Sequence, residues 1–526
     1  MEATKRKENT ATSTVKQDVI TLINHLCSGL HEREEVVKLS LLAAIAGESI
    51  FLLGPPGVGK SLIARRLKNA FADGKSFEYL MTKFSTPDEV FGPVSIKKLK
   101  DEDRFERKTD NYLPGAQVVF LDEIWKSSSA IQNALLTVVN EKVYRNGEQE
   151  VKVAMNALIT ASNELPPNSE GFGPLWDRLL IRYELDNIKD AQRFFDMITS
   201  TEDVYEDPVP SEHKLNLATL KEWQSLIPQV EVPVEVLHSL QMIRKRIDQW
   251  NAANDGEALL IHDRRWKKII HVLRASAFLN GRARVDLMDA FLMLHCLWNQ
   301  PHQQLKLREI IASTIRDHGY SIALPMADLQ REVKSFEQEV REETTVVRKS
   351  TVKGLKPVQD EYYELKKIDS QFEGKYIKVN HFNKLSKSEV EVVNFYDDNF
   401  SLVNRLNAKK SADEFAITVT YNSQETSYPL ETQEIEKEER IQRKPHELIV
   451  HHWNERYAAI VDEMHAAQKK LRGDDDGKWL ADLQSNIFID ARLAPLVKAN
   501  HEEVSAQLKG LLLRMEKARF QYEEQA

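Results

Sequence analysis

The chain has 526 residues, which is too long for one hydrophobic core and predicts about three or four domains. Hydrophobic residues make up 42% of the chain and charged residues 29%, as in ordinary globular proteins. The net charge of −9 argues against a general nucleic-acid binder, which usually carries a basic stripe. We therefore expect no nucleic-acid partner, with local basic patches left open.

The two cysteines, Cys27 and Cys296, fit neither a disulfide pattern nor a metal-ligand spacing. They favour a reducing compartment, so we expect a cytoplasmic location. Residues 1–17 are polar and contain no apolar run, so we expect a disordered tail and no signal peptide. The longest apolar stretch, 39–53, is interrupted by Gly47, and we expect no membrane span.

The first predicted domain is a nucleotide-binding core over residues 18–190. It opens with two amphipathic helices, the second of which ends at Gly47. Residues 49–53 form a short apolar run typical of a buried strand, and residues 62–70 follow with helical spacing. A strand and a helix in this order are the frame that a phosphate-binding loop requires.

Between that strand and helix, eight residues match the phosphate-binding pattern G-x-x-x-x-G-K-[ST], namely Gly54, Pro55, Pro56, Gly57, Val58, Gly59, Lys60 and Ser61. The glycines allow backbone N–H groups to point at phosphate oxygens, and the helix N-terminus adds a favourable partial charge. We predict that Lys60 reaches the β- and γ-phosphates of ATP or ADP, and that Ser61 ligates Mg²⁺.

A second apolar strand, 118–121, is followed directly by Asp122 and Glu123. Ligands of open parallel sheets bind at the carboxyl ends of the strands. Two adjacent carboxylates after a buried strand are costly without a cation partner. We predict that Asp122 holds the Mg²⁺ shell through water and that Glu123 activates the attacking water.

Between the two strands, residues 94–117 are charged and mixed, and we interpret them as a surface insertion containing a hairpin. This insertion is either a solvated loop or a substrate-contacting one. Further on, Asn146-Gly147 between alternating runs predicts a hairpin. The next apolar strand, 157–162, ends at Asn163, whose amide is placed to position the attacking water.

Two pairs of arginines are candidates for contacts with the nucleotide. Arg178 and Arg182 lie one helical turn apart, and either one can reach a phosphate. Arg264 and Arg265 begin a helix in the all-helical region 191–300, where a positive charge opposes the helix macrodipole. That cost predicts an anionic partner for one of them.

The last third of the chain differs in pattern. Residues 301–343 and 440–526 predict a discontinuous helical stalk, and residues 344–430 show the period-two alternation of a small inserted β-rich domain. We expect an acidic linker at 431–439. The acidic loop 473–477 lacks EF-hand spacing, so its carboxylates are interpreted as solvated.

These motifs resemble the AAA+ ATPases, and more closely their MoxR branch, over residues 18–300. The resemblance rests on the 54–61 loop, 120–123, 162–164, Asp177-Arg178 and Asp263-Arg264. It implies that these segments are Walker A, Walker B, sensor 1, the arginine finger and sensor 2. The implied fold class is an α/β AAA+ P-loop module with an all-α lid, followed by the helical stalk with its inserted β-rich domain.

The whole chain is also similar to the regulatory ATPase variant A group within this branch. That resemblance implies a homohexameric ring with ATP between subunits and a chaperone-like role beside a von Willebrand factor A protein. It also implies docking on the inducible lysine decarboxylase through the β-rich domain, 344–430.

The function predicted from the sequence is an ATP-hydrolysing ring that remodels a partner protein. The alternative is a nucleotide-gated scaffold that assembles on ATP with little turnover, and Glu123 favours hydrolysis because a scaffold needs no water-activating carboxylate. A GTPase is disfavoured because no Asn-Lys-x-Asp motif follows the strands. The acidic net charge disfavours a nucleic-acid translocase.

Overall fold

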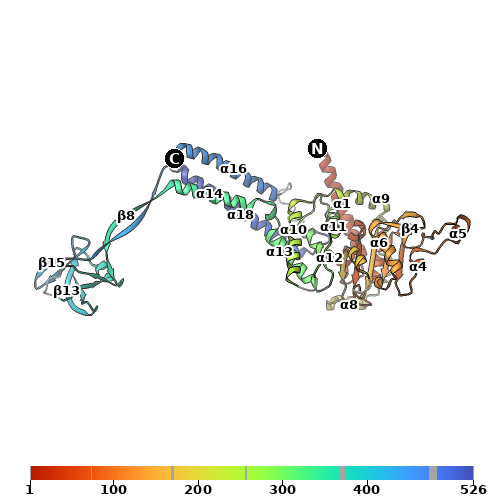
Figure 1. The fold of residues 1–526 in the computed structure, drawn as a ribbon, viewed down its shortest axis with the longest axis horizontal. Coiled ribbons are helices and arrows are strands. Elements are labelled where there is room, and N and C mark those ends of the chain that lie inside the picture. The colour runs from red at the N-terminus through yellow and green to blue at the C-terminus, as the bar shows by residue number, and fades with distance from the viewer. Residues whose placement is uncertain are drawn as a thin grey trace. The chain divides into compact units, whose positions relative to one another are not determined.

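Figure 1 shows the chain as a computed structural model that describes residues 2–72, 74–167, 171–254, 258–366, 373–472 and 483–524. The chain divides into two compact units. The first unit combines residues 1–330 and 462–512, and the second combines residues 331–461 and 513–526. The acidic loop 473–477 lies outside the described residues.

The first unit is organised around a five-stranded parallel sheet with the strand order β2–β3–β6–β1–β7. Its strands are β1 (Ser49–Leu53), β2 (Ser76–Leu80), β3 (Val118–Asp122), β6 (Ala157–Ser162) and β7 (Ile181–Glu184). Every residue of β1 and β6 is buried, as expected for strands covered on both faces. The predicted α/β fold class is confirmed.

Helices and a hairpin surround this sheet. The helices are α1 (Glu2–Cys27), α2 (Glu34–Ala46), α3 (Lys60–Lys68), α4 (Pro87–Phe91), α5 (Ile96–Glu102), α6 (Ser129–Glu141) and α7 (Gly173–Arg178), with short 3-10 turns η1 (Leu113–Gly115) and η2 (Ile124–Lys126). The predicted hairpin is formed by β4 (Val143–Asn146) and β5 (Gln149–Lys152). Gly147 in its turn has φ 65°, a conformation that favours glycine.

Two segments of this unit differ from the sequence prediction. Helix α1 begins at Glu2, so residues 2–17 of the predicted disordered tail are helical, and residues 2–14 contain no glycine or proline that would end a helix. In the insertion 94–117 the predicted hairpin is wrong. Ser95 instead caps the short helix α5, and a single bridge joins Val94 to Arg107.

Helices follow throughout 191–300, the region predicted as an all-α lid, and continue within the same unit into 303–323, which was predicted as the start of the stalk. They are α8 (Ala191–Thr199), α9 (Leu217–Leu226), α10 (Val234–Ala253), α11 (Asp263–Leu279), α12 (Leu294–Leu297) and α13 (Gln303–His318), with 3-10 turns η3 (Ser211–His213), η4 (Ile227–Gln229), η5 (Asp289–Met293) and η6 (Ser321–Ala323). Residues that return late in the chain complete this unit as η7 (Leu483–Ser485), η8 (Ala491–Leu493) and the start of α18 (Ala494–Glu523).

A buried polar cluster attaches the returning segment to the lid. Asp289 accepts hydrogen bonds from Ser276 Oγ at 2.7 Å and from Arg282 at 2.8 Å. Asn486 of the returning segment donates to the same carboxylate at 3.2 Å. Each buried polar group in this cluster has a partner, which is the condition for burying them at low cost.

The second unit contains parts of three long helices. They are the end of α14 (Met326–Thr344), the start of α16 (Glu447–Arg472) and the end of α18. Tyr522 of α18 packs on Trp453 of α16 with ring centroids 5.2 Å apart, and Trp453 Nε1 donates to Glu339 of α14 at 3.0 Å. These contacts pair the helical segments before and after the insertion.

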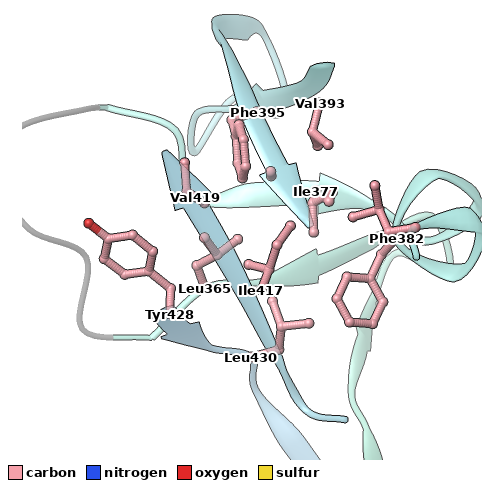
Figure 2. Packing of buried hydrophobic residues seen from close by; sticks show 11 residues of the cluster. Leu365, Ile377, Phe382, Val393, Phe395, Ile417, Val419, Tyr428 and Leu430 are labelled. Carbon is pink, nitrogen blue, oxygen red and sulfur yellow. The ribbon is translucent and has the colours of Figure 1, made fainter. Parts of the chain in front are cut away.

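The inserted domain is a curled, seven-stranded antiparallel sheet in the order β15–β14–β13–β12–β11–β10–β9. Its elements are β9 (Pro357–Val358), β10 (Tyr362–Glu364), β11 (Tyr376–Lys378), α15 (Val379–Lys384), β12 (Glu391–Tyr396), β13 (Leu402–Lys410), β14 (Ala416–Tyr421) and β15 (Gln424–Pro429). Figure 2 shows its core, in which Ile377, Phe395 and Ile417 are fully buried. This separate core makes the domain a folding unit in its own right.

A two-stranded ribbon carries the chain into and out of this domain. Strand β8 (Thr345–Leu355) pairs antiparallel with β16 (Thr432–Gln442) along eleven residues. The prediction of a linker at 431–439 was therefore wrong. Four of the five glutamates in this segment belong to β16, whose partner strand is basic, as in the pair Lys349–Glu438 at 3.2 Å.

None of the helices in the described residues combines the length and apolar character that crossing a membrane requires.

Candidate active site

Three strand ends of the sheet meet at the candidate site. The loop 54–61 follows β1, Asp122 is the last residue of β3, and Asn163 follows β6. In the sheet β6 lies between β3 and β1, so the three ends are neighbours at the carboxyl edge. This is the edge at which parallel sheets bind their ligands.

The glycines of the loop leave room for a ligand. Gly57 and Gly59 have φ 87° and 90°, and a Cβ built on either one would meet nothing within 4 Å. Gly54 is different, because a Cβ there would lie 2.5 Å from the Leu185 carbonyl oxygen. Gly54 is thus needed for packing, while the other two allow the loop conformation beside open space. Helix α3 begins directly after them at Lys60, which directs its free N–H groups at that space.

Lys60 is held by neutral oxygen atoms. Its Nζ donates to Gly54 O at 2.6 Å, Pro55 O at 3.0 Å and Asn163 Oδ1 at 2.5 Å. Burial lowers the pKa of Lys60, and the nearby Asp122 and Glu123 charges oppose that effect. No ion pair among the described residues includes Lys60, so this buried cation lacks the anionic partner that a nucleotide phosphate would supply.

The two carboxylates after β3 have different environments. Burial raises the pKa of Asp122, whose Oδ1 accepts from the Glu123 N–H at 2.9 Å. Glu123 has φ 52°, in the left-handed region, and its carboxylate pairs with Lys126 Nζ at 3.1 Å. A divalent cation would lower the cost of the buried Asp122 charge, and Ser61, in the first turn of α3, would be the residue to offer it a hydroxyl oxygen. The residues present therefore fit a nucleotide with Mg²⁺.

Arg178 lies at the other end of the sheet. Its backbone oxygen accepts from Ser49 Oγ at 3.0 Å, and Ser49 is the first residue of β1, whereas the phosphate loop follows its last. A five-residue strand spans about 16 Å. The Arg178 side chain donates to Pro174 O at 2.7 Å. Burial and the nearby Arg264 lower its pKa. The structure therefore does not bring Arg178 to Lys60 of the same chain.

Arg264 lies beside Arg178, away from the phosphate loop. It contacts Asp177 at 3.4 Å and Asn140 at 3.2 Å. Arg265 contacts the other Asp177 oxygen at 3.0 Å and Asn299 at 3.1 Å. The side chain of Arg264 is 35% exposed and that of Arg265 only 2%. Asp177 is the acidic partner of both, and Arg264 is the one that can reach a ligand.

Arg182, the alternative to Arg178, is fully buried. Its guanidinium lies 3.6 Å from the centre of the Trp176 ring and donates to the backbone oxygens of Leu179, Trp176 and Trp298 and to Asn299. Burial lowers its pKa well below the usual value. With its donors occupied in the core, Arg182 has a packing role.

Sequence reasoning missed Arg33, which contacts the phosphate loop. Its Nε donates to Val58 O at 3.1 Å and an Nη donates to Asp186 O at 2.8 Å. Arg33 thereby connects the loop to the segment that follows β7. An arginine just before a helix gives no signal of this contact in the sequence, since its partners are backbone oxygens distant along the chain.

The matches to family models cover all of these residues. Residues 17–225 match a model described as the MoxR domain in the MoxR-vWA-beta-propeller ternary systems, and residues 235–311 match an AAA lid domain. The first match includes the phosphate loop, Asp122, Glu123, Asn163 and Arg178, and the second includes Arg264.

Two curated relatives come from Methanocaldococcus jannaschii. The uncharacterized protein MJ0812 is 34% identical over 59% of this chain and 79% of its own length. The uncharacterized protein MJ0079 is 33% identical over 59% of this chain and 77% of its own. Among solved structures, a putative ATPase from Cytophaga hutchinsonii ATCC 33406 covers 60% of this chain and 98% of its own, with 18% identity and a TM-score of 0.47.

Proposed function

We propose that this chain, which belongs to the MoxR family of AAA+ proteins, hydrolyses ATP at sites completed by neighbouring copies of itself. The phosphate loop 54–61 holds the phosphates, with Lys60 on the β- and γ-phosphates. Ser61 and Asp122 hold Mg²⁺. Glu123 activates the attacking water and Asn163 positions it. Arg178 acts on the nucleotide of the adjacent copy, and Arg264 contributes from the same side.

The observation that supports this proposal is that the phosphate-loop residues and the candidate arginines lie at opposite ends of strand β1. Lys60, Asn163 and Asp122 gather at the carboxyl edge of the sheet. Arg178 and Arg264 gather near the start of β1, at the opposite end of that strand from the phosphate loop. Charge stabilisation by an arginine therefore requires a second copy, which is the arrangement of a head-to-tail assembly. A homohexameric ring is the form that we propose.

The family model supports a partner class. Its description names von Willebrand factor A and β-propeller proteins, and we propose that this chain remodels a protein of such a system. Docking of the inserted β domain on an inducible lysine decarboxylase is a narrower proposal, which rests only on the resemblance to the regulatory ATPase variant A group.

A nucleotide-gated scaffold remains the second candidate. The observation that favours it is the ion pair between Glu123 and Lys126, which occupies the carboxylate that hydrolysis requires. In the hydrolytic cycle this pair must open when nucleotide and Mg²⁺ bind.

Turnover and binding of two variants separate the candidates. We expect Glu123→Gln to bind ATP like the parent and to lose at least about 10²-fold in kcat, because the carboxylate acts only on the attacking water. Lys60→Gln is the matched control and should lose nucleotide binding itself. Parent turnover that matches that of Glu123→Gln would contradict the ATPase and favour the scaffold.

A further inference from the structure

Helix α8 carries an apolar face that is exposed in the single chain. Phe194, Phe195, Met197 and Ile198 are 44%, 55%, 42% and 56% exposed, and no residue of the helix is buried. At 100° per residue, these side chains form one continuous face about 160° wide. A surface helix normally turns such a face toward the core, so this face has no cover in the single chain.

The polar side of α8 is anchored to the body of the first unit. The Asp190 side chain caps the helix by accepting from Arg193 N at 2.9 Å. Arg193 pairs with Glu34 of α2 at 3.1 Å. Glu32 accepts from the backbone N–H groups of Lys189 and Asp190 at 3.0 and 2.8 Å. These contacts hold the N-terminal part of the helix against the first unit, while its apolar face stays exposed.

This face adjoins the nucleotide end of the sheet. Strand β7 ends at Glu184, which is in register with Leu53, the residue before the phosphate loop. Arg33 bonds both to Val58 of the loop and to Asp186, four residues before the α8 cap. The segment that leads into α8 therefore lies beside the phosphate loop, and α8 lies at the margin of the first unit (Figure 1).

The opposite end of the same unit has matching features. Leu260 is 63% exposed. Its carbonyl accepts from Asn299, whose Oδ1 in turn accepts from Arg265, the residue that follows Arg264. One end thus presents an exposed leucine with Arg264 and Arg178, and the other an apolar helix flanked by carboxylates and the phosphate loop.

We propose that the apolar face of α8 is the docking surface for a second copy of this chain, which presents its Leu260 end and thereby brings its Arg178 to the phosphate loop. This inference rests on the proposed function, since the missing arginine is what makes a second copy necessary. Because the two faces differ, the contact is heterologous and repeats from copy to copy, as ring closure requires.

The first test uses the double variant Phe195→Asp/Ile198→Asp of the full chain. Both side chains are exposed, so the fold should persist, as circular dichroism can verify. We expect sedimentation with ATP to show loss of assembly, unchanged affinity for a fluorescent ATP analogue and a fall in kcat of about 10³-fold from loss of the arginine. Leu448→Asp, at a position 74% exposed on α16, is the matched control and should assemble like the parent.

A mixing experiment tests the direction of the contact. The α8 variant keeps its arginine end, and Arg178→Ala keeps its α8 face, so a mixed pair contains one complete site. We expect the mixture to recover turnover that neither variant has alone. Absence of recovery would overturn the assignment of α8 as the receiving surface.

The outcomes separate this inference from the proposed function. Normal assembly and turnover of the α8 variant would overturn the inference alone and assign the face to a different protein. A parent chain that neither assembles nor hydrolyses ATP would overturn the proposed function as well.

Discussion

At the scale of single residues, the burial of the Lys142 ammonium group lowers the free energy of unfolding. Lys142 ends α6 with φ 54°, and burial lowers its pKa from 10.5 to about 8. Between these two pH values the unfolded chain binds one proton more than the folded chain. Stability therefore rises with pH from about 8 to 10.5, and below pH 8 the full cost of the buried charge is present.

We expect Lys142→Met to stabilise the protein at pH 7 by about 1–3 kcal/mol and to remove the rise above pH 8. Thermal unfolding at pH 7 and pH 9.5 measures both effects, with Lys221→Met at an exposed site of α9 as the control. A Lys142→Met variant less stable than the parent at pH 7 would show that the ammonium has a favourable partner, such as Glu48.

The sequence pattern does not show which arginine of each candidate pair is buried. Arg178 and Arg182 looked equivalent in the sequence, and so did Arg264 and Arg265. The structure separates each pair by burial, since Arg182 and Arg265 are enclosed by Trp176, Asn299 and backbone oxygens. These partners are distant along the chain, so spacing alone does not distinguish a buried arginine from an exposed one.

At the scale of elements, the central strands β1, β3 and β6 were predictable because each is a largely apolar run followed by a polar residue or glycine. The ribbon β8–β16 was not, because its strands are stabilised by cross-strand charges. Strand β16 has four glutamates among its eleven residues. This composition predicts a linker, because the basic partner strand β8 is distant along the chain and its pairing is not visible in the sequence.

The pairing of β8 with β16 shows where the chain can be cut and rejoined to remove the inserted domain. Val347 and Arg440 are paired in register, so Asn-Gly between them would close a shortened hairpin after deletion of 348–439. We expect this variant to keep assembly and to keep turnover within about twofold, because the domain has its own core. Partner binding should be lost.

A deletion of 344–430 is the informative contrast. It removes β8 and leaves β16 without its partner, and an unpaired strand edge promotes aggregation. We expect this second variant to aggregate in light scattering although it removes fewer residues. Loss of hydrolysis in the 348–439 deletion would show that the domain belongs to the motor.

An aromatic cluster joins the two functional ends of the sheet. Trp125, two residues after Glu123, packs on Trp176 with ring centroids 5.8 Å apart, and Phe51 of β1 contacts both. Trp176 is two residues before Arg178. The fold thus places Glu123 and Arg178 on segments that share one rigid core.

At the scale of the whole molecule, the α/β core, the lid and the inserted β domain follow from the sequence because hydrophobic periodicity marks each of them. The sequence does not show that the arginines and the phosphate loop occupy opposite ends. That separation depends on a contact distant along the chain, in which the first residue of β1 bonds to the Arg178 backbone while the phosphate loop follows the last residue of β1.

The central claim is that each site is completed by a neighbouring copy, and mixing two inactive variants tests it most directly. Arg178→Ala lacks the arginine and Glu123→Gln lacks the water-activating carboxylate, but a pair in the right order contains both groups at one interface. We predict that the mixture hydrolyses ATP well above the sum of its components. A mixture no more active than its components, although both variants bind ATP and assemble, would contradict the account.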